Sequence, residues 1–402
     1  MYSVDEALAK ILPEFKQLSA RQVAISHAAG RVLAADVTAA IDLPPFTNSS
    51  MDGYAVRAAD VQAANTILAV IGDIAAGTFP TQIVGTGQAM RIMTGAPMPE
   101  GADTVVPIED TDGGDRMAST LPTTVRVNHA PEAGAYVRPI GEDIQSGQVV
   151  LRAGRVLRPA DIGVLAGLGI AHVTVIRRPK IALLSTGDEL LNVTDPLTPG
   201  KIHDTNGYTL SALVRALGGS VIRLGIAHDT VADVQRHLDR AISHGAHLIL
   251  SSAGVSVGAF DVVKSVIESM GAIDFWKVNM RPGKPLAFGQ VQGIPFIGLP
   301  GNPVSAMVTF DVFVRPAILK LGGHSWEVPY DEAITTEPFS SDGRRTYLRV
   351  QVDRRDGDLF ARSTGSQSSG VLTSLVNADG LLIIPDGMTD VPAGTRLPIR
   401  LF

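Results

Sequence analysis

The chain has 402 residues, 45% of them apolar, and this length and composition can fill the cores of two to four domains. Its formal net charge of −6 argues against a nucleic-acid binder that relies on general basicity, although it leaves room for a local basic pocket. Cysteine is absent, which excludes disulfides, thiolate metal ligands and cysteine nucleophiles and fits a cytoplasmic protein. No apolar run approaches a membrane span, and the first residues lack the basic start and apolar core of a signal peptide.

The N-terminal part predicts an extended domain interrupted by a small β domain. Ser3 and Glu6 have the spacing of a capping box, and the apolar stripe that follows them predicts a first helix. Residues 54–138 combine short strands with Gly/Pro turns, and the chain then returns to apolar pieces like those before them. We therefore predict that 54–138 is an insertion into a domain formed by residues 1–53 and 139–178.

Polar loops with small residues mark three places in this region. Asp52 lies in the proline-stiffened segment PPFTNSSMDGYAVR, and Thr94 lies in MTGAP, whose small residues leave the backbone open to a ligand. Arg138 and Asp143 belong to a further polar loop, YVRPIGEDIQSG.

Residues 179–321 carry the clearest fold signal. Short apolar strands at 181–184, 221–227 and 247–250 alternate with helical patterns, one of which begins at the capping residue Thr230. Strands that alternate with helices of 10–15 residues indicate βαβ units and a sheet covered on both faces. We predict a central α/β domain with a mostly parallel sheet.

Several acidic residues follow the predicted strand ends, namely Asp188, Glu189, Asp229 and Asp261. Ligands of such sheets bind beyond the carboxyl ends of the strands, and unpaired carboxylates gathered there would repel one another. A hard cation such as Mg²⁺, bridging to phosphate, would resolve the repulsion. Helix N-caps at strand–helix junctions would explain about two of these acids without any metal.

The stretch from Lys284 to Ser305 predicts an anion site. A lysine in the turn RPGKP precedes a short hairpin, and the apolar run 294–299 ends in a Gly-rich turn that feeds a helix with Asn302 as its cap. Free backbone N–H groups at a helix N-terminus, with a lysine nearby, attract anions. An ordinary strand–turn–helix connection with a surface lysine is the alternative.

Residues 326–402 alternate with a period of two, which predicts a small β domain without a helix. The domain carries Arg344, Arg345 and Arg349 and a run of hydroxyl residues around 366–369. Arginines and hydroxyls together suit an oxyanion, although a serine-rich turn is commonly only a turn.

The chain closely resembles the MoeA family, which is homologous to the E domain of gephyrin, over nearly its whole length. The combination of motifs is specific, although single pieces such as STGDEL are not. The segments that carry the resemblance are, in order, PPFTNSSMDGYAVR, RIMTGAPMPEGADTVV, GEDI, STGDEL, DTNGYTL, SSAGVSVGAFD, RPGKP and GLPGNPVS.

The resemblance implies an elongated cytoplasmic homodimer with four domains per chain, of which 179–321 is a MogA-like α/β domain and 326–402 a C-terminal β domain. The implied reaction takes adenylylated molybdopterin and molybdate, with Mg²⁺, and yields molybdenum cofactor and AMP. Transient contact with a MogA-like adenylyltransferase and with molybdoenzymes is also implied, with neither nucleic acid nor membrane as a partner.

The resemblance also implies roles for individual residues. Three acids would hold Mg²⁺ or orient the attacking water or oxyanion: Glu189, Asp229 and Asp261. Catalytic roles fall on these three and on Asp52, Thr94 and Lys284, with Asp52 and Thr94 completing the cleft of the partner chain. Substrate-binding roles, which include the molybdate contacts, fall on Arg138, Asp143, Ser252, Gly254, Ser256, Arg281, Pro285, Pro300, Asn302, Ser305, Arg345, Arg349, Ser366, Ser368 and Ser369.

One position departs from the family pattern, since Arg281 stands where a lysine is expected. The charge survives, but a guanidinium fork differs from a point charge, and the affinity for an oxyanion or phosphate could differ with it. Two other functions compete with the implied one: a scaffold that binds molybdopterin or a protein without chemistry, and a MogA-like adenylyltransferase. The strand-end acids argue against the scaffold, and the domains outside 179–321 argue against the adenylyltransferase.

Overall fold

The computed structural model describes residues 1–112, 120–252, 260–327 and 329–402, except for the side chains of residues 260, 261 and 275. The chain forms two compact units, which are considered separately. Unit 1 consists of residues 1–23, 30–34 and 174–402, and unit 2 of residues 24–29 and 35–173. Among the described helices, none is long and apolar enough to cross a membrane.

Unit 1 is built on a six-stranded sheet in the order β15-β12-β16-β20-β19-β17. The first four strands are parallel, β19 is antiparallel to β20, and β17 is antiparallel to β19. The prediction of a mostly parallel sheet is therefore confirmed. The strands are β12 (Lys180–Thr186), β15 (Ser220–Ala227), β16 (Leu248–Ser252), β17 (Gly271–Lys277), β19 (Pro285–Val291) and β20 (Ile294–Leu299).

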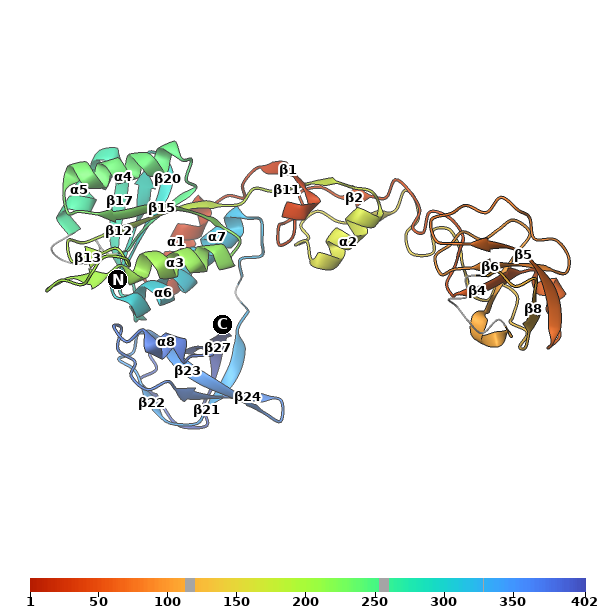
Figure 1. Ribbon diagram of the computed structural model, residues 1–402. Coiled ribbons are helices and arrows are strands. Elements are labelled where there is room, and N and C mark those ends of the chain that lie inside the picture. The colour runs from red at the N-terminus through yellow and green to blue at the C-terminus, as the bar shows by residue number, and fades with distance from the viewer. Residues whose placement is uncertain (113–119, 253–259, 328) are drawn as a thin grey trace. The chain divides into compact units, whose positions relative to one another are not determined.

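Helices cover both faces of this sheet. Successive residues of a strand point to opposite faces, so each strand packs against helices on both sides. Leu183 and Leu250 pack with the helices of one face, whereas Leu184 and Ile249 pack with those of the other. Figure 1 shows α3 and α6 on one side of the sheet and α4 and α5 on the other. The helices of this unit are α1 (Val4–Ile11), α3 (Thr205–Ala216), α4 (Val231–Ser243), α5 (Phe260–Met270), α6 (Pro303–Thr309) and α7 (Arg315–Leu321), with a π-helical turn at Phe310–Val314 between α6 and α7.

Local sequence signals define several of these ends. The capping box at Ser3 and Glu6 is present at the start of α1, with both reciprocal hydrogen bonds formed. Thr230 caps α4 by accepting from the Asp233 amide. Gly218 follows the end of α3 with a φ of +76°, a left-handed conformation that favours glycine.

The C-terminal part of unit 1 is a closed β barrel. Its strands run in the order β23-β24-β21-β27-β25, and pairing of β25 with β23 completes the ring. The predicted β domain is confirmed, but the expected absence of a helix is wrong: α8 (Thr373–Val376) is a helix of four residues, too short to produce a periodic pattern. The barrel strands are β21 (Asp331–Thr335), β23 (Arg345–Arg355), β24 (Asp358–Ser363), β25 (Gly380–Ile384) and β27 (Arg396–Leu401), with β22 (Phe339–Ser340) and β26 (Asp390–Val391) paired beside them.

A two-residue strand ties the lysine turn to this barrel. β18 (Met280–Arg281) runs parallel to β23, with Met280 opposite Arg345 and Arg281 opposite Thr346. The turn that follows needs a glycine at Gly283, which has a φ of +102° and where a Cβ would collide with the Thr309 hydroxyl. The barrel therefore holds the start of the predicted anion site.

Unit 2 contains a five-stranded sheet in the order β7-β4-β6-β5-β8 and two short pairings. This confirms the β character predicted for the inserted segment; the exact boundaries of the four domains stay predictions. The sheet strands are β4 (Gly53–Val56), β5 (Thr66–Ile74), β6 (Gln88–Ile92), β7 (Thr104–Pro107) and β8 (Thr124–Val127). The other elements of this unit are β2 (Val37–Thr38) with β10 (Val149–Leu151), β3 (Asn48–Ser49) with β9 (Val137–Arg138), and α2 (Pro159–Gly167). The pair formed by β1 (Ala20–Ala24) and β11 (His172–Ile176) lies mostly in unit 1.

Candidate functional site

The carboxyl ends of four parallel strands form one edge of the central sheet. In the register of the sheet, Ser185 of β12 lies opposite Ser252 of β16, which lies opposite Leu299 of β20. The segments that leave these strands therefore emerge side by side, and they carry the motifs TGDE, HDT and PGNP. This is the edge at which ligands of such sheets bind.

Three of the predicted acids meet at this edge. The Asp229 amide and the His228 ring nitrogen Nδ1 each lie 3.4 Å from Oδ1 of Asp188. Glu189 turns its carboxylate back over Gly187, where a Cβ would overlap it. Burial, reinforced by the negative charges of Asp188 and Glu189, raises the pKa of Asp229.

Asp229 is the least exposed of these three acids. Its Oδ1 is buried and has no hydrogen-bond partner within the described residues. A buried carboxylate oxygen without a donor, beside two further carboxylates, is an acceptor that lacks a positive partner.

The helix caps at this edge are other residues. Asp204 caps α3 by accepting from the Gly207 amide at 2.8 Å, and Thr230 caps α4. Capping therefore does not explain Asp188, Glu189 or Asp229. Among the described side chains no group of three or more His, Asp or Glu residues is arranged to hold a metal, and the side chain of Asp261 lies outside that set.

Asp204 and Asn206 belong to the edge but were not predicted as site residues. Asp204 is almost fully buried, accepts from the Ser185 hydroxyl at 2.9 Å and lies 3.5 Å from the Arg223 guanidinium. Asn206 donates to the Gly301 carbonyl at 2.7 Å and so holds the turn between β20 and α6. The DTN motif, used only for the family resemblance, was the available signal.

The turn between β20 and α6 also contacts the barrel. Asn302 occupies the N-cap position of α6, but its side chain makes no capping bond and donates instead to the Ser369 hydroxyl at 3.1 Å. The Val304 amide donates to the Ser369 carbonyl at 3.2 Å. The predicted cap is thus right in position and wrong in its hydrogen bond, because the Ser369 carbonyl accepts from the Val304 amide, which a capping side chain would otherwise bind.

Arg349 and Arg281 line a cationic cavity of about 320 Å³ between β18 and the barrel. Only 1% of Arg349 is exposed, and it donates to the Ser374 hydroxyl and the Ser368 carbonyl at 3.2 and 3.3 Å. No carboxylate pairs with it in the described part of the chain. Burial, reinforced by the nearby charge of Arg281, lowers the pKa of Arg349 to about 10. An unneutralised guanidinium in such a cavity favours an anion.

Gln367 also lines this cavity and was not predicted. Its side-chain amide accepts from the Arg349 backbone N–H and donates to the Arg349 carbonyl, both at 3.0 Å. This pair of bonds fixes the serine-rich turn onto β23. The polar run SQSS was the signal, but only its serines were predicted as ligands.

Two further cations lie at the lysine turn. Arg281 is exposed and lies 3.7 Å from Asp342, which is itself held by Arg344. Lys284 is exposed, and the described residues place no carboxylate within ion-pair distance of its amino group. Lys284 is therefore available to a ligand.

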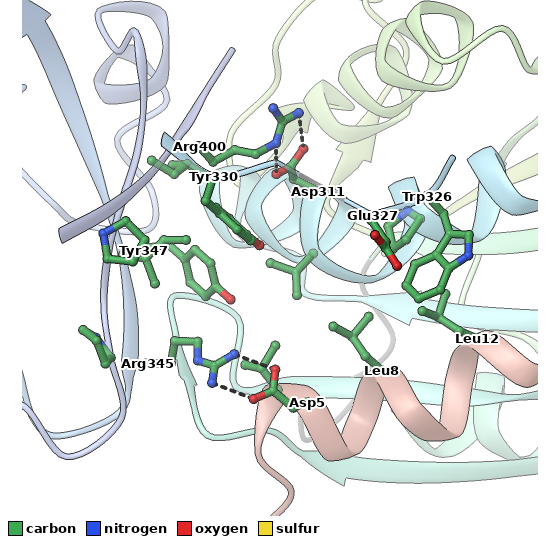
Figure 2. A pocket seen from close by; sticks show the side chains of 17 residues that line it. Asp5, Leu8, Leu12, Asp311, Trp326, Glu327, Tyr330, Arg345, Tyr347 and Arg400 are labelled. Atoms are coloured by element: carbon green, nitrogen blue, oxygen red, sulfur yellow. Dashed lines mark hydrogen bonds and ion pairs between the residues drawn. The ribbon is translucent and has the colours of Figure 1, made fainter. Parts of the chain in front are cut away.

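Arg345 is engaged elsewhere, although it is only four residues from Arg349. Its guanidinium makes two bonds of 2.8 Å to the carboxylate of Asp5 in α1 and a third, of 3.1 Å, to Asp386. Figure 2 shows this pair at one end of a mainly apolar cavity of about 470 Å³, with Asp311 and Arg400 paired at another side. The bonds join α1 to the barrel, so the structure favours Arg349 over Arg345 as an anion ligand.

Unit 2 brings Asp52 and Thr94 together. The Thr94 amide and hydroxyl both donate to Oδ1 of Asp52, at 2.7 and 2.6 Å. Gly53 is required beside them, because a Cβ there would collide with the Val106 carbonyl. In the same unit Arg138 pairs with Glu142 at 3.1 Å, while Asp143 is exposed.

The remaining predicted residues are distributed over the edge and the barrel. Ser252 is buried and donates to the Ser185 hydroxyl at 3.4 Å. Pro300 and Ser305 are buried, Pro285 is half-buried, and Ser366 and Ser368 are exposed on the serine-rich turn. Gly254 and Ser256 lie outside the described residues.

Three family models together match most of the chain. They are the MoeA N-terminal region (domain I and II) at residues 2–169, a probable molybdopterin binding domain at 182–320, and the MoeA C-terminal region (domain IV) at 332–402. The last two correspond to the central α/β part and to the barrel of unit 1.

Curated relatives and solved structures agree with these matches. The chain is 40% identical over 389 residues to molybdopterin molybdenumtransferase 2 of Mycobacterium tuberculosis, with 94% of each chain covered. It is 37% identical over 407 residues to molybdopterin molybdenumtransferase of Haemophilus influenzae, covering 100% of this chain and 99% of the relative. A solved molybdopterin biosynthesis MoeA protein of Pyrococcus horikoshii superposes with a TM-score of 0.77 at 29% identity, covering 100% of both chains. The chain belongs to the MoeA family.

Proposed function

We propose that this protein is a molybdopterin molybdenumtransferase that inserts molybdenum from molybdate into adenylylated molybdopterin and releases molybdenum cofactor and AMP. The observation that carries the proposal is the pairing, within unit 1, of an acidic strand-end edge with a cationic cavity. The names of the relatives support the class of reaction. The geometry supports binding of the phosphate at the acidic edge and of molybdate in the cationic cavity.

Hydrogen bonds join the two places. Asn206, beside the acidic edge, donates to the Gly301 carbonyl. Asn302, the next residue after Gly301, donates to the Ser369 hydroxyl. The carbonyl of Ser368 in turn accepts from Arg349. The substrates of the proposed reaction carry a phosphoanhydride and a metal oxyanion, and these groups need a cation and cationic donors respectively.

The acids fit Mg²⁺ in donor chemistry. Oxygen ligands suit this ion, and the buried Oδ1 of Asp229 lacks a positive partner. Asp229 and Glu189, with Asp261 as the third acid, would hold the ion, which when bound supplies positive charge to the phosphate oxygens. Burial, with the negative charges of Asp188 and Glu189 added to it, raises the pKa of Asp229, and a bound cation would favour its ionised form. Asp229 and Glu189 would also orient the attacking water or oxyanion.

The cationic residues suit molybdate. The oxyanion would enter the cavity of Arg349, with Arg281 at its wall and Lys284 at the adjoining turn. Ser369 supplies a hydroxyl that already bonds to the turn before α6. These donors would place molybdate for exchange of its oxygens with the dithiolene sulfurs of the pterin.

Asp52 and Thr94 enter the proposal as a pair that acts across a homodimer. Their short hydrogen bonds fix one carboxylate orientation in unit 2. A symmetric dimer can build each cleft from two chains, and we propose that this pair completes the cleft of the partner chain.

The test is incubation of the purified protein with adenylylated molybdopterin, molybdate and Mg²⁺, followed by measurement of AMP. We expect AMP release that requires all three additions. Formation of the adenylate from ATP and molybdopterin would identify an adenylyltransferase instead. Tight binding of the pterin without AMP would identify a scaffold.

A further inference from the structure

Two segments of the chain carry positive charge without any acidic residue. Residues 15–35 and 162–187 contain no Asp or Glu, although the whole chain has 40 acidic residues against 34 Lys and Arg. Residues 185–187 end at the candidate site, but the positive charges of the two segments lie outside it. Their cations are Lys16, Arg21, Arg31, Arg177, Arg178 and Lys180.

The fold of unit 1 brings these segments together. The Arg177 amide donates to the Ser19 carbonyl at 3.1 Å, and the Ile176 amide donates to the Val32 carbonyl at 2.9 Å. Three stretches of backbone thus run side by side around residue 176. The Arg31 guanidinium crosses to the Ile176 carbonyl at 2.7 Å, next to Arg177 and Arg178 in the chain.

Arg31 is the most unusual member of this cluster. It is 5% exposed, and its Nε is buried without a hydrogen-bond partner. Within the described residues, neither Arg31 nor Arg21 nor Arg178 has a carboxylate partner. Burial, followed by the charges of Arg21 and Arg178, lowers the pKa of Arg31 to about 10. Three guanidinium groups therefore influence one another with no negative charge between them.

We propose that Arg21, Arg31 and Arg178 form a binding site for a phosphate-class oxyanion, separate from the cavity of Arg349. Planar guanidinium groups present several N–H donors and match the geometry of phosphate oxygens. Bound there, the anion neutralises the cluster and accepts from the two exposed arginines, while Arg31 keeps its bond to Ile176. The anion is either a free ion or the phosphate group of a small phosphate monoester.

Thermal unfolding of the full-length protein tests the site. The midpoint temperature is measured against inorganic phosphate at constant ionic strength, and again against glycerol phosphate. A ligand of the native state raises this temperature with its concentration. In the double variant Arg21→Ala/Arg178→Ala, we expect the phosphate concentration for half of the effect to rise at least about tenfold, since two charge-assisted contacts are lost. This variant keeps the buried Arg31, which protects the fold.

Two controls make the result specific. Arg152→Ala removes an exposed arginine of unit 2 and should leave the phosphate response unchanged. Lys284→Ala, at the lysine turn, reports instead on phosphate that binds in the candidate site. A response that disappears in Lys284→Ala and persists in the double variant would overturn the proposal, because the anion would then bind at the candidate site. A change in the solution mass of the double variant with an intact phosphate response would overturn it too, by showing that the arginines join chains.

Discussion

Replacing Lys284 with alanine should weaken the use of molybdate far more than the binding of adenylate. Its amino group is exposed and has no described carboxylate partner, so the substitution removes a charge without breaking a packed contact. A hydrogen bond to a charged group contributes about 1.5–3 kcal/mol, which corresponds to about a 10- to 150-fold change in the molybdate concentration required. Because solvent screens the charge of an exposed lysine, we expect the required molybdate concentration to rise about tenfold. Lys284→Arg, which keeps the charge but alters the donor geometry, should lose less.

The assay is the dependence of cofactor formation on molybdate concentration, with nucleotide binding measured in parallel by calorimetry. Nucleotide affinity should change little, since the phosphates are assigned to the acidic edge around Asp229. Loss of nucleotide binding with a normal molybdate response would reverse the assignment and place Lys284 on the phosphate. An unchanged response in both assays would remove Lys284 from the site.

Three further predictions concern the acids. Asp229→Asn should abolish Mg²⁺-dependent AMP release, and wild-type Mg²⁺ dependence in this variant would contradict the assignment. The same variant should raise the unfolding temperature of the metal-free protein at neutral pH. The reason is that the pKa of Asp229 is raised in the folded state, so ionisation of Asp229 destabilises the fold as pH rises through that pKa. At a limiting molybdate concentration, Asp52→Asn mixed with Lys284→Ala should recover part of the activity that each variant has lost, since one cleft of the mixed dimer carries neither change. No recovery after confirmed subunit exchange would place both residues in one cleft of a single chain. Asp5→Asn should reduce the free energy of unfolding by about 0.5–1 kcal/mol at pH 7, as expected for an exposed ion pair. Because Arg345 lowers the pKa of Asp5, this difference in unfolding free energy should be present above the ordinary pKa of an aspartate and vanish as pH falls through the lowered pKa. Urea titrations at pH 7 and at a pH below the lowered pKa check it.

The sequence by itself determined the features that depend on local chemistry. The apolar run 294–299 was predicted as a strand and forms β20 with the same bounds, because its neighbours on both sides are turn residues. The caps at Ser3 and Thr230 also formed as predicted, since a cap needs only residues within one helical turn. The alternation of strands and helices likewise fixed the central α/β domain and therefore the edge at which Asp188, Glu189 and Asp229 meet.

Only the tertiary structure decided which side chains remain free for a ligand. Arg345 and Arg349 lie on one strand and are equivalent in pattern, yet Asp5, 340 residues away in the chain, neutralises Arg345, while Arg349 has no carboxylate partner in the described structure. Asn302 could cap its own helix, but the Ser369 carbonyl of the barrel accepts from the Val304 amide, and the Asn302 side chain donates to the Ser369 hydroxyl. Availability depends on charges and donors that are distant in sequence and close in space, and a single sequence pattern carries no information about that distance.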